Sequence, residues 1–426
     1  MSYDIDYIRS QFPALNLKVN GFPATYFDGP GGTQVPQRVI DAVGFHLSNC
    51  NANEDGFFKT SFKTNEIISG GRSALADLFG SDPEEIAFGQ NTTTLIYQLA
   101  FALGRNPGKR NEILITEIDH EANRGPWQAL KERGFKIREA RFDPETCTLD
   151  LNDFKAKLND NTLVAAFNYA SNGIGTINDV REMARLAGQA GAISVVDAVH
   201  YAPHGPIDVK AIGVDYLICS AYKFFGPHIG VLYGKRERFE ELQTYRLRVH
   251  TSEIPYCIET GTLNHEGIAG VTEAVEFIAD IGSKFGKKKS DPLLNQAKLS
   301  TRRSNILAGM EELEKYEQPL AQKIIDGLTE LEDVNIYSPP EGYPKTSTIS
   351  FTIDGLSPDR IASLLGEKGL FVWSGHFYSL RLVERLELDQ TGGLVRIGLS
   401  PYNTETEVDR LLLEIEKIAS SRAKGT

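Results

Sequence analysis

Two short segments decide how this chain is interpreted: AISVVDAVH at residues 192–200 and DYLICSAYK at residues 215–223. Each is a run of apolar and β-branched residues that ends in polar ones, a pattern typical of a buried strand in a parallel sheet. The first segment brings Asp197 to the end of its strand, and the second brings Lys223 just past the end of the next. In open α/β sheets, ligands bind outside the carboxyl ends of the strands. The two segments therefore predict a binding site that holds this carboxylate and this amine.

An aspartate and a lysine in these positions suit pyridoxal 5'-phosphate. The lysine amine can form a Schiff base with the aldehyde, and the aspartate can keep the pyridine nitrogen protonated. Either residue alone is more often an exposed or helix-capping side chain. The neighbours favour the cofactor, because Ser220 offers a hydroxyl to a phosphate and FFGP at residues 224–227 forms an apolar, turning exit.

Two further segments could bring backbone groups close to a ligand. The glycine-rich YFDGPGGT at residues 26–33 permits a close approach of the backbone, although an ordinary surface loop explains it equally well. NTTT at residues 91–94 precedes an apolar helical pattern at 95–103. A helix that opens on threonines offers unpaired N–H groups and its dipole to an anion such as a phosphate. Threonine caps also occur without any ligand, so this segment alone leaves the phosphate site open.

Strand and helix patterns alternate through the first part of the chain. Apolar strand patterns at 113–116, 163–167, 193–196 and 216–219 alternate with helical patterns, notably at 122–133 and 178–190. This order predicts a parallel sheet wound on both faces. His120 and Asn172 follow two of these strands. The histidine could stack on a cofactor ring or could be a hydrogen-bonded structural residue.

The C-terminal part reads as a mixture of strands and helices. Strands are expected at 346–353, 371–373 and 394–399, and helices at 358–368 and 405–420. We therefore expect an α/β protein with a large, doubly wound, mainly parallel sheet domain and a smaller α+β C-terminal domain. The expected boundaries are 1–25 for an N-terminal segment that packs with the small domain, 26–285 for the large domain and 286–426 for the small one.

Composition excludes several classes of partner. The 426 residues carry a net charge of -12, which leaves no basic excess to bind a nucleic acid or an anionic membrane. No apolar run approaches the roughly twenty residues that span a bilayer, and the acidic MSYDID start lacks a signal pattern, so a cytoplasmic enzyme is expected. The four cysteines are scattered without metal-ligand spacing, so neither a disulfide framework nor a metal site is predicted.

From about residue 20 to residue 420 the chain resembles fold-type I pyridoxal phosphate enzymes of the class V aminotransferase group. The resemblance is strongest to SufS-like cysteine desulfurases and selenocysteine lyases. It implies a pyridoxal 5'-phosphate cofactor, a small amino-acid substrate and a homodimer with shared sites. It also implies roles for particular residues. Cofactor contacts are implied for Thr92, Thr93, His120, Asn172, Asp197, His200, Ser220, Tyr222, Lys223 and Thr262, where Thr262 reaches the phosphate of the neighbouring subunit.

Within that resemblance, Lys223 is the Schiff-base lysine and His120 stacks on the pyridine ring. Asn172 and Arg396 contact the substrate carboxylate, and Arg396 would hold it in a bidentate manner. His200 and Tyr222 replace a glutamine and a histidine that are usual in the family, and both keep a hydrogen-bonding group near the cofactor.

A third departure concerns the chemistry. Desulfurases carry a cysteine on a loop of the type Arg-x-Gly-His-His-Cys, and the matching stretch here is WSGHFY at residues 373–378. A phenol with an ordinary pKa of about 10 cannot accept sulfur as a persulfide, whereas a thiolate can. Because Tyr378 stands where the cysteine should be, we expect C–S lyase or aminotransferase chemistry. The alternatives are a genuine desulfurase that uses another cysteine, and a non-catalytic regulatory protein that binds the cofactor.

Overall fold

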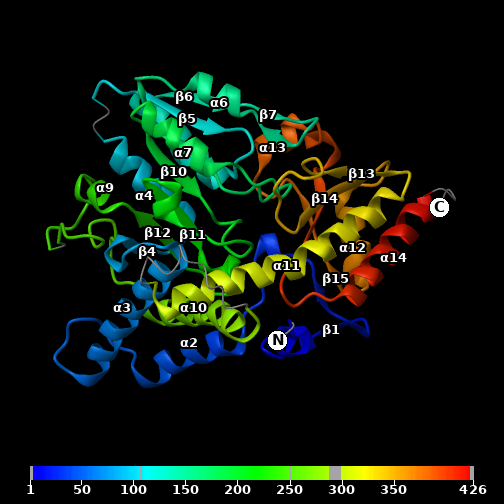
Figure 1. Ribbon diagram of the computed structural model, residues 1–426, viewed down its shortest axis with the longest axis horizontal. Coiled ribbons are helices and arrows are strands. Elements are labelled where there is room, and N and C mark those ends of the chain that lie inside the picture. Colours follow the sequence, from blue (N-terminus) through cyan, green and yellow to red (C-terminus); the bar gives the residue numbers. More distant parts are fainter. Residues whose placement is uncertain (1–2, 106–107, 250, 287–298, 423–426) are drawn as a thin grey trace.

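The computed structural model describes residues 3–105, 108–249, 251–286 and 299–422. A seven-stranded sheet and a four-stranded sheet organise the chain (Figure 1). The first is mainly parallel and packed on both faces, and the second belongs to a smaller α+β unit. The predicted fold class is therefore confirmed.

The larger sheet has the strand order β4-β12-β11-β10-β9-β5-β6. In that order, the strands span Ile86–Gly89, Gly230–Gly234, Tyr216–Ser220, Ile193–Asp197, Thr162–Asn168, Glu112–Thr116 and Lys136–Ala140. All neighbours pair in parallel except β12, which is antiparallel to both β11 and β4. In this register Asp197 lies opposite Asn168 of β9, so the polar carboxyl ends of the central strands meet at one edge.

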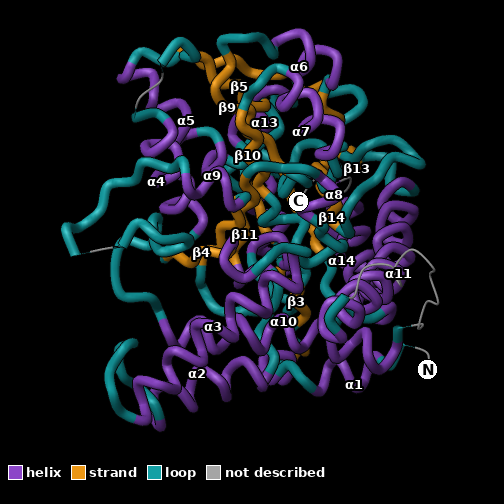
Figure 2. The backbone as a smooth tube through the Cα atoms, turned by 60° about the vertical axis from the view of Figure 1, so that its left-hand side comes forward, coloured by secondary structure: helices purple, strands orange, loops and turns teal. Residues whose placement is uncertain are grey.

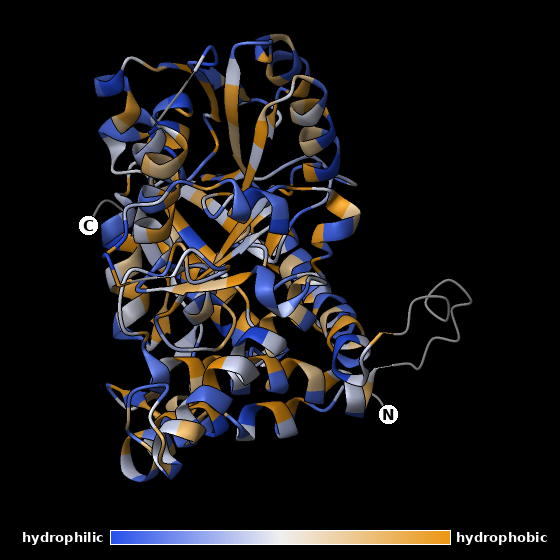
Figure 3. Cartoon of the chain, turned by 90° about the vertical axis from the view of Figure 1, so that its left-hand side faces the viewer, coloured by the Kyte–Doolittle hydropathy of each residue, from blue (hydrophilic) through white to orange (hydrophobic). Residues whose placement is uncertain are grey.

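Successive side chains of the central strands point into two separate apolar cores, because side chains alternate between the faces of a sheet. Val196 belongs to one core together with helix α7 (Val180–Gln189). Val195 belongs to the other together with helix α4 (Thr92–Leu103). Figure 3 shows the result as largely hydrophobic strands surrounded by helices that mix hydrophilic and hydrophobic residues. Burial on both faces explains why these strands read as continuous apolar runs.

The smaller sheet is antiparallel, with the order β13-β14-β17-β16. Its strands span Val334–Tyr337, Thr348–Ile353, Leu394–Gly398 and Trp373–Gly375. The helices α11 (Thr301–Thr329), α12 (Pro358–Glu367) and α14 (Glu405–Arg422) share an apolar core with it. Near this sheet β15 (Leu370–Phe371) pairs in parallel with β3 (Thr25–Tyr26), which places the N-terminal segment beside the C-terminal part.

The other helices lie mostly around the larger sheet. They are α1 (Ile5–Ser10), α2 (Gln37–Asn49), α3 (Lys59–Phe79), α5 (Gly125–Gln128), α6 (Leu151–Lys157), α8 (Val209–Ile212), α9 (Arg236–Glu240), α10 (His265–Phe285) and α13 (Leu380–Arg385). Helix α10 contacts both α2 and α3, and Figure 2 shows the three together at one end of the molecule. The short strands β1 (Lys18–Val19) and β2 (Phe22–Pro23), and β7 (Phe142–Asp143) and β8 (Thr148–Leu149), form two small antiparallel pairs.

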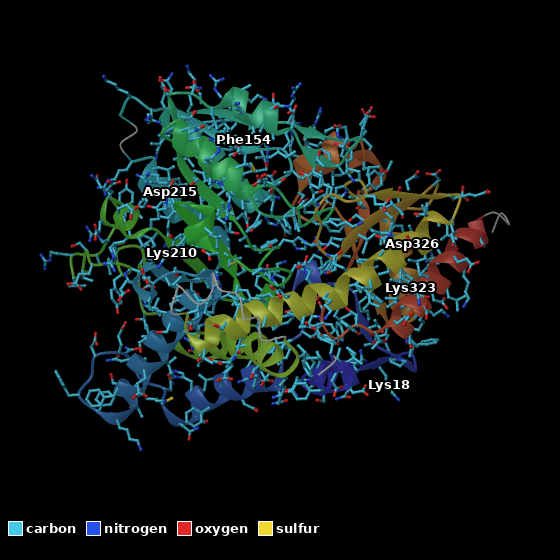
Figure 4. All side chains as sticks on the ribbon, viewed as in Figure 1. Lys18, Phe154, Lys210, Asp215, Lys323 and Asp326 are labelled. Carbon is cyan, nitrogen blue, oxygen red and sulfur yellow. The ribbon has the colours of Figure 1, made fainter. Side chains whose placement is uncertain are left out.

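Helix α11 joins the two parts of the molecule. It contacts α3 and α10 beside the larger sheet and β13, β14 and α14 beside the smaller one. Lys323, on the α14 side of this helix (Figure 4), forms ion pairs with Glu405 at 2.8 Å and Asp409 at 2.5 Å. Pro319 lies inside the helix.

Several features differ from the sequence-based expectations. The strand expected at 371–373 is divided between β15 and β16, which belong to different sheets, and β6 and β13 were not predicted. The predicted helix at 122–133 is broken into the four-residue α5 with 3-10 turns on either side, because Pro126 has no N–H for a preceding helical turn. β12 was not predicted and makes the sheet mixed. It follows β11 after the short connection 221–229, and so short a link joins neighbouring strands only when they are antiparallel.

The predicted domain boundaries at residues 25 and 285 stay predictions, and the second adjoins residues 287–298, which are outside the described residues. Within the described ranges, no helix combines the length and the apolar character needed to cross a membrane.

Candidate active site

A cavity of about 770 Å³ is lined by the carboxyl ends of β9, β10 and β11 and by residues of β16 and β17 in the smaller sheet. The structure brings almost all of the predicted site residues to this cavity. Its lining includes Thr92, Thr93, His120, Asn172, Asp197, His200, Ser220, Tyr222, Lys223 and Arg396. Thr262 is the exception, because it is exposed on a loop outside the cavity lining of its own chain.

Lys223 lies in a 3-10 turn directly after β11, and its Nζ donates a hydrogen bond to the carbonyl of Pro30 in the glycine-rich turn. Burial lowers the pKa of Lys223 to about 7, with a further lowering by the charge of Arg396 and opposing effects of Asp197 and Asp28. The amine therefore loses its proton near neutral pH. A neutral amine is the form that attacks an aldehyde.

Asp197 ends β10, the strand next to β11. One of its carboxylate oxygens accepts a hydrogen bond of 2.9 Å from the backbone N–H of Val199. Burial raises the pKa of Asp197 to about 6 in spite of this bond and of the charge on Lys223. A cationic group beside the carboxylate would stabilise its ionised form, because opposite charges favour each other's ionisation.

The N-terminus of α4 lies beside the end of β11, so hydroxyl groups and free helical N–H groups are close together there. The Thr92 hydroxyl donates to the carbonyl of Cys219 at 2.8 Å and also contacts the Ser220 hydroxyl. The first N–H groups of an α-helix have no partner within the helix and attract anions. Gly230 permits this arrangement, since a Cβ there would lie 2.8 Å from the backbone nitrogen of Thr92.

His120 forms one wall of the cavity as a neutral ring. Its Nδ1 accepts a hydrogen bond of 3.0 Å from the backbone N–H of Ala122, which leaves Nε2 as the nitrogen that carries the proton. Burial, followed by the charges of Lys223 and Arg396, lowers the pKa of His120 to about 4. A flat, uncharged ring in this place can pack against an aromatic ligand.

His200 connects the cavity to the smaller sheet. Its Nε2 lies 3.2 Å from the Thr346 hydroxyl and 3.0 Å from the Thr348 hydroxyl at the start of β14. Burial lowers the pKa of His200, and the nearby His204 lowers it further. His204 in turn contacts the carboxylate of Glu317 on α11 at 3.1 Å.

Arg396 on β17 lines the cavity, and part of its guanidinium has no hydrogen-bond partner among the described residues. It is 4% exposed, and its Nη1 donates to the carbonyl of Asn172 at 2.8 Å. Its Nε is buried without a partner among the described residues. Burial lowers the pKa of Arg396 to about 9, which still leaves it charged at neutral pH. A buried guanidinium with unused donors is suited to bind a carboxylate.

The segment that carries Tyr378 is held against the site by three hydrogen bonds. The Asn172 side-chain amide donates to the Phe377 carbonyl at 2.9 Å, and its oxygen accepts from the Ser379 hydroxyl at 2.7 Å. The Glu121 N–H donates to the Tyr378 carbonyl at 2.7 Å. Phe377 and Tyr378 both have positive φ, at 52° and 57°, a conformation that costs free energy for residues with side chains.

The cysteines lie elsewhere. Cys50, Cys147, Cys219 and Cys257 are all buried, and none of them is among the described residues that line the cavity. Burial raises the pKa of Cys147 and of Cys257 to about 11, and it also raises the pKa of Cys219. These thiols are therefore poor nucleophiles at neutral pH.

Asp28 is a charged residue beside the site that sequence patterns did not indicate. Its Oδ1 is buried without a partner among the described residues, and burial raises its pKa to about 6 against the effects of Arg396 and Lys223. The available signal was its place in the glycine-rich turn, immediately before Gly29. The aromatic residues Trp373 and Phe377, which also line the cavity, were not assigned a role either.

Comparison with known proteins places this geometry in a family. The family model described as Aminotransferase class-V matches residues 25–305 and 304–411. A protein described as a probable cysteine desulfurase, from Halalkalibacterium halodurans, is 31% identical over 96% of this chain and 97% of its own length. The chain belongs to the aminotransferase class-V family.

Other relatives of this class-V chain are also named for desulfuration. A cysteine desulfurase of Yersinia pseudotuberculosis is 29% identical and covers 98% of the chain and 99% of its own length. The apo structure of a cysteine desulfurase from Thermococcus onnurineus superposes with a TM-score of 0.85 at 27% identity, with 98% of each chain covered. A cysteine desulfurase from Escherichia coli shares the fold, with a TM-score of 0.82 at 23% identity over 98% of each chain. The class-V chain is thus a cysteine desulfurase-like member of a family of pyridoxal phosphate-dependent enzymes.

Proposed function

We propose that this protein is a pyridoxal 5'-phosphate enzyme that acts on a small L-amino acid by C–S lyase or aminotransferase chemistry. The observation that carries the proposal is the composition of the cavity. Lys223, Asp197, Arg396 and Tyr378 all line it, and by the resemblance of WSGHFY to the desulfurase loop Tyr378 would stand where those enzymes have their cysteine. The first three residues support cofactor and amino-acid binding, and the tyrosine argues against persulfide formation.

The donor set fits the cofactor. Lys223 offers an amine of lowered pKa to an aldehyde, and Asp197 offers a buried carboxylate that a protonated pyridine nitrogen would stabilise. The phosphate would be held by the hydroxyls of Thr92, Thr93 and Ser220 together with the N-terminus of α4. When bound, the cofactor supplies an electron sink that stabilises negative charge at the substrate's Cα.

The remaining steps belong to the protein's own residues. Arg396 would bind the substrate carboxylate with its unused donors, and Asn172 would keep the guanidinium oriented through their 2.8 Å contact. Lys223, neutral near pH 7, would take up and return the proton at Cα. His120 would hold the cofactor ring from one side, and His200 and Tyr222 would contact it as hydrogen-bonding groups.

The alternatives are less well supported. A desulfurase that uses another cysteine would need a thiolate at the cavity, and the buried thiols with raised pKa values lie outside it. A non-catalytic cofactor-binding protein has no reason to keep Arg396, which would serve the substrate and not the cofactor.

We also propose a two-fold homodimer in which Thr262 completes the phosphate site of the neighbouring subunit. Its support is the position of Thr262 on an exposed loop next to Glu259. The Glu259 carboxylate forms a buried ion pair of 2.7 Å with Arg72 and accepts a 2.7 Å hydrogen bond from the Phe88 N–H, so the base of this loop is rigidly anchored.

Two measurements test the proposed function. Borohydride reduction of the purified yellow protein, followed by peptide mapping, should place the cofactor on Lys223; attachment to any other lysine would remove the basis of the proposal.

Incubation with L-cysteine should give either no sulfur release or sulfide with an equal amount of pyruvate, and no protein-bound persulfide in the mass spectrum. Alanine together with a persulfide would instead establish desulfuration by a cysteine from elsewhere in the chain.

A further inference from the structure

The substrate side of the cavity has an unusual composition. Among the described residues that line it, two are lysine or arginine: Lys223 and Arg396. The proposed function already gives a role to both. The carboxylate of Glu121, at the same wall, is paired with Arg124 at 3.1 Å. This subunit therefore offers no further lysine or arginine from its described lining to neutralise a charged acidic side chain on the substrate.

The rest of that wall is aromatic, and most of it comes from one segment. Trp373 on β16 is the direct cross-strand neighbour of Arg396 on β17, which puts the two side chains on the same face of the sheet. The indole packs closely on the glycine-rich turn, because a Cβ at Gly31 would lie 2.3 Å from its Nε1. Gly31 is therefore needed for Trp373 to take this position.

Two more rings of the same segment surround Arg396 and His120. The guanidinium carbon of Arg396 lies 4.1 Å from the centre of the Phe377 ring. The Tyr378 ring lies 5.5 Å from the ring of His120, centre to centre. Both rings are aimed by the positive-φ backbone that Asn172 and Glu121 hold in place. Strained backbone that is held in place by hydrogen bonds, here one from the Asn172 side chain and one from the Glu121 N–H, is typical of functional positions.

These rings keep apolar surface available for a ligand. Trp373 is 51% exposed and Tyr378 is 67% exposed, although both line the cavity. Trp373 and Phe377 are the aromatic neighbours of Arg396, so they are the surface that a side chain would meet when Arg396 holds the substrate carboxylate. Aromatic surface of this kind binds large apolar groups and gains little from a side chain as short as that of alanine or cysteine.

We propose that the substrate is an L-amino acid with a bulky, uncharged, apolar side chain, seated against Trp373, Phe377 and Tyr378. The proposal rests on the proposed function: it keeps a free L-amino acid as the small-molecule substrate and specifies that its side chain is large and apolar and not short. In this arrangement Tyr378 does not replace the desulfurase cysteine as a nucleophile; its ring forms part of the side-chain pocket.

Binding can be measured without any turnover. The chain has two tryptophans, of which Trp127 is fully buried and Trp373 is half-exposed, so a ligand on the aromatic wall changes the emission of Trp373 selectively. Cofactor-loaded protein is titrated with L-phenylalanine, L-methionine and S-benzyl-L-cysteine, with L-alanine and L-cysteine as short side chains, and with L-glutamine and L-glutamate as a pair that differs in charge. Emission and the thermal midpoint are recorded together.

We expect the bulky apolar amino acids to bind at least about tenfold more tightly than L-alanine, and L-glutamine to bind more tightly than L-glutamate. Trp373→Phe should abolish the emission change while the thermal shift remains. Tyr378→Ala and Trp373→Ala should each weaken L-phenylalanine about tenfold and leave L-alanine unchanged. Phe22→Ala removes an exposed aromatic ring outside the cavity and serves as the matched control.

The inference is overturned if L-alanine or L-cysteine binds as tightly as L-phenylalanine, if L-glutamate binds best, or if both alanine variants keep wild-type affinity for L-phenylalanine. With the cofactor mapped to Lys223, such a result leaves the proposed function standing and removes only the substrate class. A protein that attaches no cofactor at Lys223 removes both.

Discussion

At the scale of single residues, Asp28 adds a second carboxyl group to the charges around the site. With Asp197 it provides two carboxyl groups beside the cations Lys223 and Arg396, and the pKa of each carboxyl is raised to about 6. At neutral pH both carboxyls are ionised. The pKa of Lys223, lowered to about 7, decides how much of its amine is neutral and can attack an aldehyde.

The rate of cofactor uptake should follow the ionisation of Lys223. Below pH 7 the amine is protonated and cannot attack, and above pH 7 it is free, so the initial rate should rise with pH and level off above a midpoint near 7. Mixing apoprotein with pyridoxal 5'-phosphate across the pH range, followed by absorbance, measures this. A rate that still rises beyond pH 9 would mean that Lys223 keeps a pKa close to its ordinary 10.5.

Arg396 should act on the substrate and not on the cofactor. Arg396→Ala is expected to leave cofactor content nearly unchanged and to weaken amino-acid binding by about 2 to 5 kcal/mol, because a desolvated carboxylate would lose its paired charge. Spectrophotometric titration measures both quantities. Arg385→Ala, which removes a partly exposed arginine outside the cavity lining, is the control. Unchanged amino-acid affinity in Arg396→Ala would exclude this residue from the substrate site.

Sequence patterns located most of the candidate site because strand ends converge at one edge of a parallel sheet. Asp197 and Ser220 were placed by that rule, and Arg396 by resemblance. Asp28 and Phe377 were not assigned, since their positions depend on contacts across long sequence separations. The hydrogen bond from the Asn172 side chain to the Phe377 carbonyl is one such contact, and no local sequence pattern predicts it.

At the scale of elements, α10 and α11 pack closely against each other. A Cβ at Gly282 would lie 1.8 Å from the carbonyl oxygen of Asn305, and one at Gly309 would lie 2.3 Å from the carbonyl oxygen of Ile278. At these two glycines the backbone of one helix therefore lies directly against the backbone of the other. The crossing point depends on two glycines, Gly282 and Gly309, that no local sequence pattern connects.

Gly282→Ala should destabilise the protein by about 1 to 3 kcal/mol, because the added methyl group forces the two helices apart. Urea unfolding with the cofactor removed measures the change. Gly188→Ala is a matched control, since Gly188 lies in α7 with open space around its Cα, and alanine there should be neutral or stabilising. Equal stability of the two variants would contradict the close packing of α10 on α11.

Errors at this scale have physical causes. The helix expected at 122–133 contained enough apolar residues for helical spacing, but the Gly125-Pro126 pair interrupts its hydrogen bonding. No strand was assigned at β12, and its antiparallel direction follows from the short connection after Lys223.

At the scale of the whole molecule, large apolar side chains are exposed on one region of the surface. They belong to α2, to the start of α3 and to the loop between them: Ile40 45%, Phe45 54%, Leu47 53%, Phe57 97%, Phe58 55% and Phe62 52% exposed. Exposed apolar groups concentrated in this way mark a protein interface. We assign this region to the proposed homodimer.

Phe45→Glu should therefore shift the protein from dimer to monomer in analytical ultracentrifugation, since it places a charge in an apolar interface. Cofactor should also be retained less well, because Thr262 of the second subunit is lost from the phosphate site. Leu413→Glu alters a comparably exposed leucine on α14 and should leave the dimer intact. A Phe45→Glu variant that stays dimeric would assign the interface to another surface.

Helix α11 has a mechanical consequence for the cavity. Pro319 cannot donate a hydrogen bond to the carbonyl of Lys315 one turn earlier, and helices bend where such a bond is missing. Residues of α11 before Pro319, such as Met310 and Leu313, belong to an apolar core of the larger sheet, and residues after it, such as Ile324 and Leu328, belong to the core of the smaller sheet. We therefore expect a change of the bend at Pro319 to shift the two sheets relative to each other, and with them the distance between Lys223 on one side of the cavity and Arg396 on the other.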